Sequence, residues 1–303
     1  MTLTLIHMTL VMACGTLWGV IRPVGLGAEE TRQVLTSTVY YVFLPALILE
    51  VLWSADIGMQ SVGFSILGVS SILSALILIY LVTRLLKFGR PQTGAILLAT
   101  AFPNVTYLGL PVLEKTFGSW ARSVAIQLDL FAAAPLVFTV GVMIARYYGE
   151  DEQPHKSTLL FLNTPPFWAA LIAVCLNLNH IPVPLWLGGA LKQLSVAVVP
   201  LMLFSLGLAL SWRSVKLSLL PYIVPVIIIK LLLMPLFVIE AVSYLSMSDQ
   251  HKAAAVIDLA MPSMMLGIIF CDRYKLDSAL YAMAVTITTL LSILTLPFWY
   301  SQL

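Results

Sequence analysis

The 303-residue sequence is poor in charge. Charged residues make up 10% of it, against roughly 25% in soluble globular chains, while hydrophobic residues reach 60%. A soluble domain with so few charges has little means of hydrating its surface, which excludes the ordinary globular classes. The mean hydropathy of +0.98 is instead typical of a chain solvated by lipid. The net charge of +2 is too small to indicate a nucleic-acid partner.

Residues that carry chemistry are scarce as well. The three cysteines are an odd number and widely separated, so they predict no disulfide framework and no metal centre. The four histidines are scattered, and the sequence has no zinc-protease motif, no aspartate-rich metal-binding motif and no phosphate-binding loop. An integral membrane enzyme is therefore the least favoured hypothesis, and no cofactor is expected.

Long apolar runs fill the rest of the sequence. A membrane-spanning helix needs about 20 apolar residues, and these runs predict an all-α polytopic membrane protein. No Lys or Arg precedes Arg22, so the first run predicts a retained helix, not a cleaved signal. The ten predicted transmembrane helices are 3–21, 32–53, 61–83, 92–113, 119–147, 160–178, 186–210, 217–243, 252–271 and 277–300.

The links between these spans are charged unequally. One side of the membrane receives eleven of the sixteen basic residues, namely Arg22, Arg32, Arg84, Lys87, Arg90, Arg146, Lys156, Arg213, Lys216, Arg273 and Lys275. The other side receives Lys115, Arg122 and Lys252. Because cytoplasmic loops carry the excess of Lys and Arg, the first side is predicted to be cytoplasmic, with both termini outside.

The two halves of the sequence contain similar motifs in the same order. Phe102-Pro103-Asn104 in the fourth span is matched by Met261-Pro262-Ser263 in the ninth. This similarity predicts one five-helix repeat over 1–148, a cytoplasmic link over 149–159 and a second five-helix repeat over 160–303. Since five is odd, the second copy enters the membrane inverted, as in many secondary transporters.

Pro103 and Pro262 are expected to interrupt their helices. Each is followed at once by a residue that favours a helix N-cap, Asn104 or Ser263. Broken backbone at membrane depth is tolerated where it is buried in protein or lines a cavity. Two half-helix N-termini meeting there suit a carboxylate. The alternative is that both prolines only kink packed helices, as is expected of Pro45, Pro135, Pro200, Pro225 and Pro235.

Three charged residues lie near the middle of predicted spans, where an ionisable group is costly and a functional candidate. Asp258 precedes Pro262 by four residues and is a candidate for binding a coupling proton or sodium ion. Lys230 either attracts an anionic substrate or pairs with Asp129 or Asp258. Residues near span ends are expected to snorkel to the membrane surface; these are Glu50, Glu114, Lys192 and Glu240.

These motifs resemble a known family. The segment from Ala101 to Pro111 (AFPNVTYLGLP) resembles the fourth helix of the auxin efflux carrier family, which includes bacterial malonate and malate transporters. Ala260-Met261-Pro262-Ser263, Asp272-Arg273-Tyr274 and Thr288-Thr289-Leu290-Leu291-Ser292 resemble its ninth and tenth helices. The resemblance covers essentially the whole chain, and the short central link matches the bacterial members.

The resemblance implies a ten-helix fold with crossed, broken helices four and nine. It also implies a scaffold of helices 1, 2, 6 and 7 and a transport domain of helices 3–5 and 8–10. A homodimer in the bacterial inner membrane is expected, moving a small organic anion by an elevator-like motion. The crossover residues map to Pro103, Asn104 and Pro262. Thr106 and Tyr107 replace smaller or apolar residues of relatives and bear on substrate identity.

The function predicted from sequence is a secondary carrier for a mono- or dicarboxylate. The predicted substrate-binding residues are Pro103, Asn104, Thr106, Tyr107, Pro262 and Ser263, with Asp129, Lys230 and Asp258 as coupling-ion or charge-relay candidates. Two alternatives stay open, a bile-acid-type sodium symporter and a ten-helix drug/metabolite exporter. The exporter would be expected to keep its termini inside, opposite to the charge bias.

Overall fold

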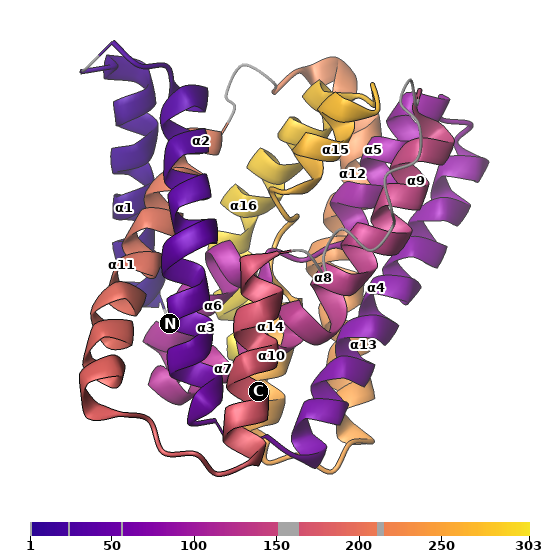
Figure 1. Cartoon of the computed structure of the whole chain (residues 1–303). Helices are drawn as coiled ribbons and strands as arrows, with labels where there is room; N and C mark the ends of the chain where they lie inside the picture. Colours follow the sequence, from indigo (N-terminus) through magenta and orange to yellow (C-terminus); the bar gives the residue numbers. More distant parts are fainter. Residues whose placement is uncertain (1, 24, 56, 151–163, 211–214) are drawn as a thin grey trace.

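The computed structural model describes residues 2–23, 25–55, 57–150, 164–210 and 215–303, and the elements in these ranges are helices (Figure 1). Six of them are long and apolar enough to cross a membrane. They are Ala28–Trp53, Met59–Leu85, Ser119–Tyr148, Leu185–Ala209, Leu217–Ser243 and Ser278–Tyr300. Two shorter apolar helices are Leu5–Ile21 and Pro165–Leu178. Residues 151–159 of the predicted link lie outside the described residues.

The helices are divided as follows. The first half contains α1 (Thr2–Ile21), α2 (Ala28–Thr38), α3 (Leu44–Trp53), α4 (Met59–Leu85), α5 (Arg90–Ala101), α6 (Leu110–Phe117), α7 (Arg122–Leu128), α8 (Ala134–Leu136) and α9 (Val142–Tyr148). The second half contains α10 (Pro165–Leu178), α11 (Leu185–Ala209), α12 (Leu220–Ile227), α13 (Met234–Ser243), α14 (Asp249–Leu259), α15 (Gly267–Arg273) and α16 (Ser278–Tyr300). The predicted spans 92–113 and 252–271 coincide with the two interrupted helices, α5–α6 and α14–α15.

Prolines shape the long helices. Four π-helical segments each end two residues before a proline: η1 (Val39–Phe43), η2 (Val105–Gly109), η4 (Asp129–Ala133) and η9 (Ile228–Leu233). The prolines that follow are Pro45, Pro111, Pro135 and Pro235. A proline has no N–H and its ring clashes with the carbonyl four residues back, so the backbone widens there. Short helices η3 (Ser119–Ala121), η5 (Val137–Gly141) and η8 (Leu217–Leu219) complete the spans.

The helices pack as two groups. We call α1, α2, η1, α3, α10 and α11 the first helix group, because each packs extensively against others of the set; in Figure 1, α1, α2, α3 and α11 lie on the left and α10 beside α3. The remaining helices form the second helix group. Gly207 lets α11 approach α1 closely, since a β-carbon there would lie 1.9 Å from the carbonyl oxygen of Met12. On α4, large side chains such as Ile66, Ile77 and Leu81 are exposed, as expected for a lipid-facing surface.

Candidate functional site: the crossing of two interrupted helices

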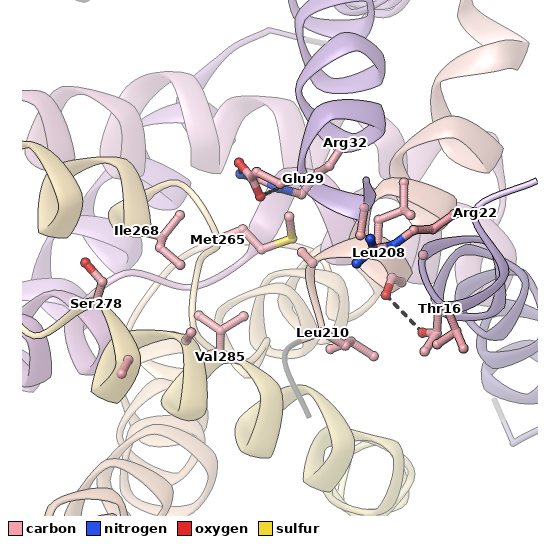
Figure 2. Close-up of a pocket in the computed structure, with 17 residues that line it drawn as sticks. Thr16, Arg22, Glu29, Arg32, Leu208, Leu210, Met265, Ile268, Ser278 and Val285 are labelled. Carbon is pink, nitrogen blue, oxygen red and sulfur yellow. Dashed lines mark hydrogen bonds and ion pairs between the residues drawn. The ribbon is translucent and has the colours of Figure 1, made fainter. Parts of the chain in front are cut away.

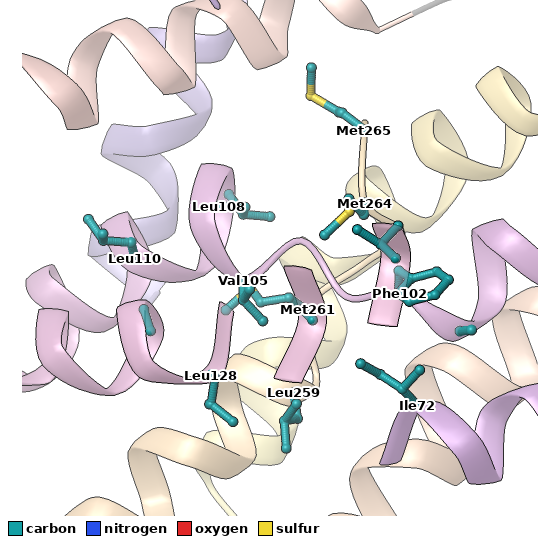
Figure 3. Packing of buried hydrophobic residues seen from close by; sticks show 14 of the residues in the cluster. Ile72, Phe102, Val105, Leu108, Leu110, Leu128, Leu259, Met261, Met264 and Met265 are labelled. Atoms are coloured by element: carbon teal, nitrogen blue, oxygen red, sulfur yellow. The ribbon is translucent and has the colours of Figure 1, made fainter. Parts of the chain in front are cut away.

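Two interrupted helices meet in the second helix group. The helix α5 ends at Ala101 and restarts as η2 at Val105, while α14 ends at Leu259 and α15 begins at Gly267. The Asn104 N–H donates to the Pro262 carbonyl and the Met264 N–H to the Phe102 carbonyl, both at 2.9 Å. Pro103 and Ser263 form an isolated antiparallel bridge between them. Apolar side chains surround this crossing, as Figure 3 shows.

Two side chains form hydrogen bonds with the backbone of the second interruption, the segment between α14 and α15. The Ser263 N–H donates to Thr288 Oγ1 at 3.2 Å, and the Tyr281 hydroxyl donates to the Met264 carbonyl at 2.5 Å. Thr288 and Tyr281 both belong to α16. Buried backbone groups are expensive to leave unpaired, so α16 stabilises the interruption between α14 and α15, where Ser263 pairs with Pro103.

The sequence prediction that Ser263 caps the start of a half-helix is wrong. Asn104 directly precedes η2 as expected, although its side chain accepts no hydrogen bond from the first turn. Ser263 lies four residues before α15, whose N-cap position is Leu266. The N–H groups of Ser263 and Met264 are already engaged with Thr288 and Phe102, which holds this segment extended. A local cap signal cannot reveal partners so distant in sequence.

The crossing also contains buried polar atoms without hydrogen-bond partners. These are both amide atoms of Asn104, both carboxyl oxygens of Asp258, and the hydroxyls of Ser263 and Thr289. Asn104 is 1% exposed and Asp258 0% exposed. Native proteins rarely leave such groups unsatisfied, and each one requires an explanation. A bound ligand is one such explanation for the amide.

A cavity of about 90 Å³ opens beside the crossing. From the second helix group it is lined by Asn104, Thr106, Tyr107, Asp129, Leu130, Ala134, Val137, Phe138, Met264 and Leu266. On the opposite wall stand Tyr40, Leu44, Thr164, Pro166 and Phe167. The Thr106 hydroxyl donates to Asp129 Oδ2 at 2.5 Å. The structure thus places Asn104, Thr106, Tyr107 and Asp129 in one cavity, and sequence reasoning missed the whole opposite wall.

The other candidate residues do not line this cavity. Pro103, Pro262 and Ser263 lie in the paired backbone of the crossing. The Asp258 carboxyl packs against Gly109, where a β-carbon would lie 2.0 Å from Oδ1. Glycine at this position therefore leaves room for the Asp258 side chain.

Lys230 lies within η9 and is buried. Its ammonium lies 3.5 Å from the carbonyl oxygen of Ala101, the last residue of α5. The positive charge faces the carbonyl end of a half-helix, where the helix dipole favours a cation. Among the described residues, Lys230 forms no ion pair with Asp129 or Asp258.

A much larger cavity, of about 920 Å³, lies between the two helix groups. Residues of α1, α2 and α11 line one side, and residues of α15 and α16 line the other (Figure 2). Arg32 and Glu29 form an ion pair within it. Met265 lines this cavity, whereas its neighbours Met264 and Leu266 line the small one. The end of the second interruption therefore lies between the two cavities.

A charged cluster joins the helix groups at the opposite end. Arg122 of α7 pairs with Glu50 of α3 at 3.0 Å and with Glu114 of α6 at 3.5 Å. The Arg122 side chain is 10% exposed. Glu50 and Glu114, which the sequence places near span ends as residues expected to snorkel, are both paired with this guanidinium.

The membrane-length apolar helices and the buried polar crossing define a multi-pass membrane protein of the transporter class. The chain belongs to the membrane transport protein family, that of the auxin efflux carriers, whose family model matches residues 1–300. An "uncharacterized transporter" of Methanothermobacter thermautotrophicus is 30% identical over 284 residues, covering 92% of each chain. Another from Methanocaldococcus jannaschii is 28% identical over 287 residues, covering 91% of each.

Proposed function

We propose that the protein is a secondary active carrier that moves a small organic anion, a mono- or dicarboxylate, across the plasma membrane by alternating access. The observation that carries this proposal is the buried Asn104 amide, which has no hydrogen-bond partner and lines the small cavity at the crossing. An amide N–H₂ at that position is a ready donor to a carboxylate oxygen.

The backbone adds to this attraction. The segments η2 and α6 form one continuous helix from Val105 to Phe117, and Asn104 stands at its start. The first N–H groups of a helix lack intrahelical acceptors and form the positive end of its dipole. In a water-poor site, that end favours a negatively charged group.

The proposed movement follows from the two helix groups. The first helix group acts as the scaffold and the second as the transport domain, within ten transmembrane helices arranged as two inverted five-helix repeats. Support comes from the large cavity at one end of the boundary and the Arg122 ion pairs at the other. A structure open on the large-cavity side and closed at the ion pairs is one of the two states that alternating access requires.

The proposed topology has the large cavity facing the cytoplasm, both termini outside, and a homodimer as the working unit. The basic residues Arg22 and Arg32 line that cavity, on the side where the positive charge of the loops accumulates. No catalytic role is proposed.

Counterflow in proteoliposomes tests the function. Purified protein is reconstituted with unlabelled mono- or dicarboxylates inside, and uptake of labelled anion is followed. Asn104→Leu and Pro262→Leu should abolish counterflow while the protein still inserts and purifies as wild type. The matched control is Asn179→Leu, at an exposed position outside the crossing. Normal counterflow by both crossing variants would refute the proposed site.

Imposed gradients separate the alternatives. Uptake that requires an inward sodium gradient would favour a bile-acid-type symporter. Absence of counterflow with every anion tested, together with transport of an uncharged or cationic compound, would favour the exporter.

A further inference from the structure

The small cavity contains an acid and no base. Asp129 is the one charged residue among its lining, and no Lys, Arg or His is present there in the part of the chain that the structure describes. An ionised Asp129 would repel the anion that the Asn104 amide attracts. A protonated Asp129 would instead be a second hydrogen-bond donor.

We propose that Asp129 carries a proton together with the substrate, and that the substrate is a small monocarboxylate. This inference rests on the proposed function. Asn104 donates from its amide to one carboxylate oxygen, and the protonated Asp129 carboxyl donates to the other. Thr106 positions Asp129 through its contact with Oδ2.

The cavity explains why one carboxylate is accepted and not two. Among the described residues, one unpartnered amide and the helix start at Asn104 face it. The start of α10 also borders it, but Pro165 and Pro166 have no N–H to donate, and N–H groups in the first turn of α15 already bond to backbone carbonyls. The rest of the lining is largely apolar or aromatic. A second carboxylate would be buried with no Lys or Arg among the described lining residues to neutralise it, which is costly. The volume of about 90 Å³ also restricts the substrate to a molecule of few non-hydrogen atoms.

Among the described residues, no Lys, Arg or His lines the cavity beside Asp129, and Arg32, which acts electrostatically on Tyr107, is paired with Glu29. Tyr40, Tyr107 and Asp258 are the titratable groups that interact with it electrostatically. The helix α4 packs against η4, yet its titratable residues, Tyr80 and Arg84, lie near its C-terminal end. The helix α7 carries Arg122 at its first residue, where it pairs with Glu50. Protonation is therefore the way in which this site can neutralise Asp129.

The proton balance of the cycle is simple. Asp129 takes a proton from water on the side where the substrate binds, and the O–H bond persists while the anion crosses. On the other side the substrate leaves first and the proton then passes to water. One proton accompanies one monoanion, so the cycle moves no net charge.

The test uses pyruvate as the monocarboxylate probe and malonate as the dicarboxylate. Pyruvate suits the purpose because little of it is in the membrane-permeant neutral form at neutral pH. In wild-type proteoliposomes, a gradient of about one pH unit, acidic outside, should drive up to about tenfold accumulation of pyruvate. A potential imposed with potassium and valinomycin should change that accumulation little, and malonate should be a poor substrate. A trapped pH dye should report one proton entering per pyruvate.

Asp129→Asn should lose the accumulation driven by the pH gradient, while slower pyruvate exchange persists with a flattened pH profile. The asparagine amide keeps a donor at this position but cannot release a proton. Asp249→Asn, an exposed acid in the first turn of α14, is the control and should behave as wild type. Thr106→Val should shift the pH profile of exchange, and Thr106→Ser should restore it.

Three results would overturn the inference: undiminished pH-driven accumulation by Asp129→Asn, uptake by wild type that responds to potential and not to pH, or a preference for malonate. If wild type shows net pyruvate uptake without proton entry, this inference fails and the proposed carrier function stands. If wild type exchanges no anion at all, the proposed function itself fails. Where Asp129→Asn does not fold, the dye measurement on wild type still tests proton coupling, and the pH profile of Thr106→Val tests the part of Asp129.

Discussion

Arg122 Nη1 lies 3.0 Å from Glu50 Oε2 and thereby joins α7 of the second helix group to α3 of the first. Glu114 stands on the other side of the same guanidinium, 3.5 Å from Nε. All three side chains are largely shielded from solvent. The contact is a direct electrostatic link across the boundary between the groups.

Arg122→Gln should lower the melting temperature in detergent, because it leaves two partly buried carboxylates without a counter-charge. Removing one partner of such a pair is costly, whereas removing both charges costs less. The double variant Arg122→Gln with Glu50→Gln should therefore be more stable than the sum of the two single effects predicts, with a coupling of about 1 kcal/mol or more. Additive effects would show that the pair contributes nothing.

Gly109→Ala should destabilise the crossing. The added β-carbon would lie 2.0 Å from Asp258 Oδ1, which forces a buried carboxyl to move. Overpacking of this kind costs about 1–3 kcal/mol, and anion exchange should fall with stability. Gly189→Ala in α11 is the control, since no atom lies within 4 Å of its new β-carbon. It should be neutral or stabilising, because alanine favours a helix. Equal melting temperatures for both variants would contradict the packing described.

Thr288→Val should weaken the second interruption. Valine preserves the shape of threonine but removes the oxygen that accepts the Ser263 N–H at 3.2 Å. A buried N–H left unsatisfied costs about 1–3 kcal/mol. Thr288→Ser keeps the oxygen and should retain most of the stability. Thermal unfolding of the two variants separates the loss of the acceptor from any loss of packing, and a Val variant as stable as the Ser variant would exclude the acceptor role.

Cysteine labelling tests the proposed orientation. Ala279 is exposed in the large cavity, and Ser246 is exposed in the link between α13 and α14. The exposed native cysteines, Cys14 and Cys175, are first replaced by serine. A membrane-impermeant maleimide should label Ala279→Cys in inside-out vesicles and Ser246→Cys in right-side-out vesicles. The reverse pattern would place the large cavity outside.

Much of the fold could be predicted from local signals. Long apolar runs mark the helices to within a few residues, and prolines mark the positions where they change. Pro103 and Pro262 lie in the interruptions, while Pro45, Pro135 and Pro235 each follow a π-helical segment. These features depend on the absent N–H and on the steric demands of the proline ring, which act on neighbouring residues.

Features that depend on distant partners could not be predicted. Nothing near Glu50 indicates that Arg122, in another helix group, pairs with it. The extended stretch before α15 depends on Thr288 and Phe102. The small cavity likewise needs Tyr40 and Phe167, which the sequence offers as ordinary aromatic residues of apolar helices. The sequence identified Asn104 and Asp129 as candidate residues, but it did not show that they line the same cavity.

The reciprocal backbone bonds between Phe102, Asn104, Pro262 and Met264 also constrain biosynthesis. The ribosome delivers the first interruption early, and its partner only after most of the chain has been made. Until then, the Phe102 carbonyl and the Asn104 N–H lack these partners within the hydrocarbon layer. A polypeptide truncated before Pro262 could not form this crossing. Membrane quality-control proteases should therefore degrade it, even though most of its helices are already inserted.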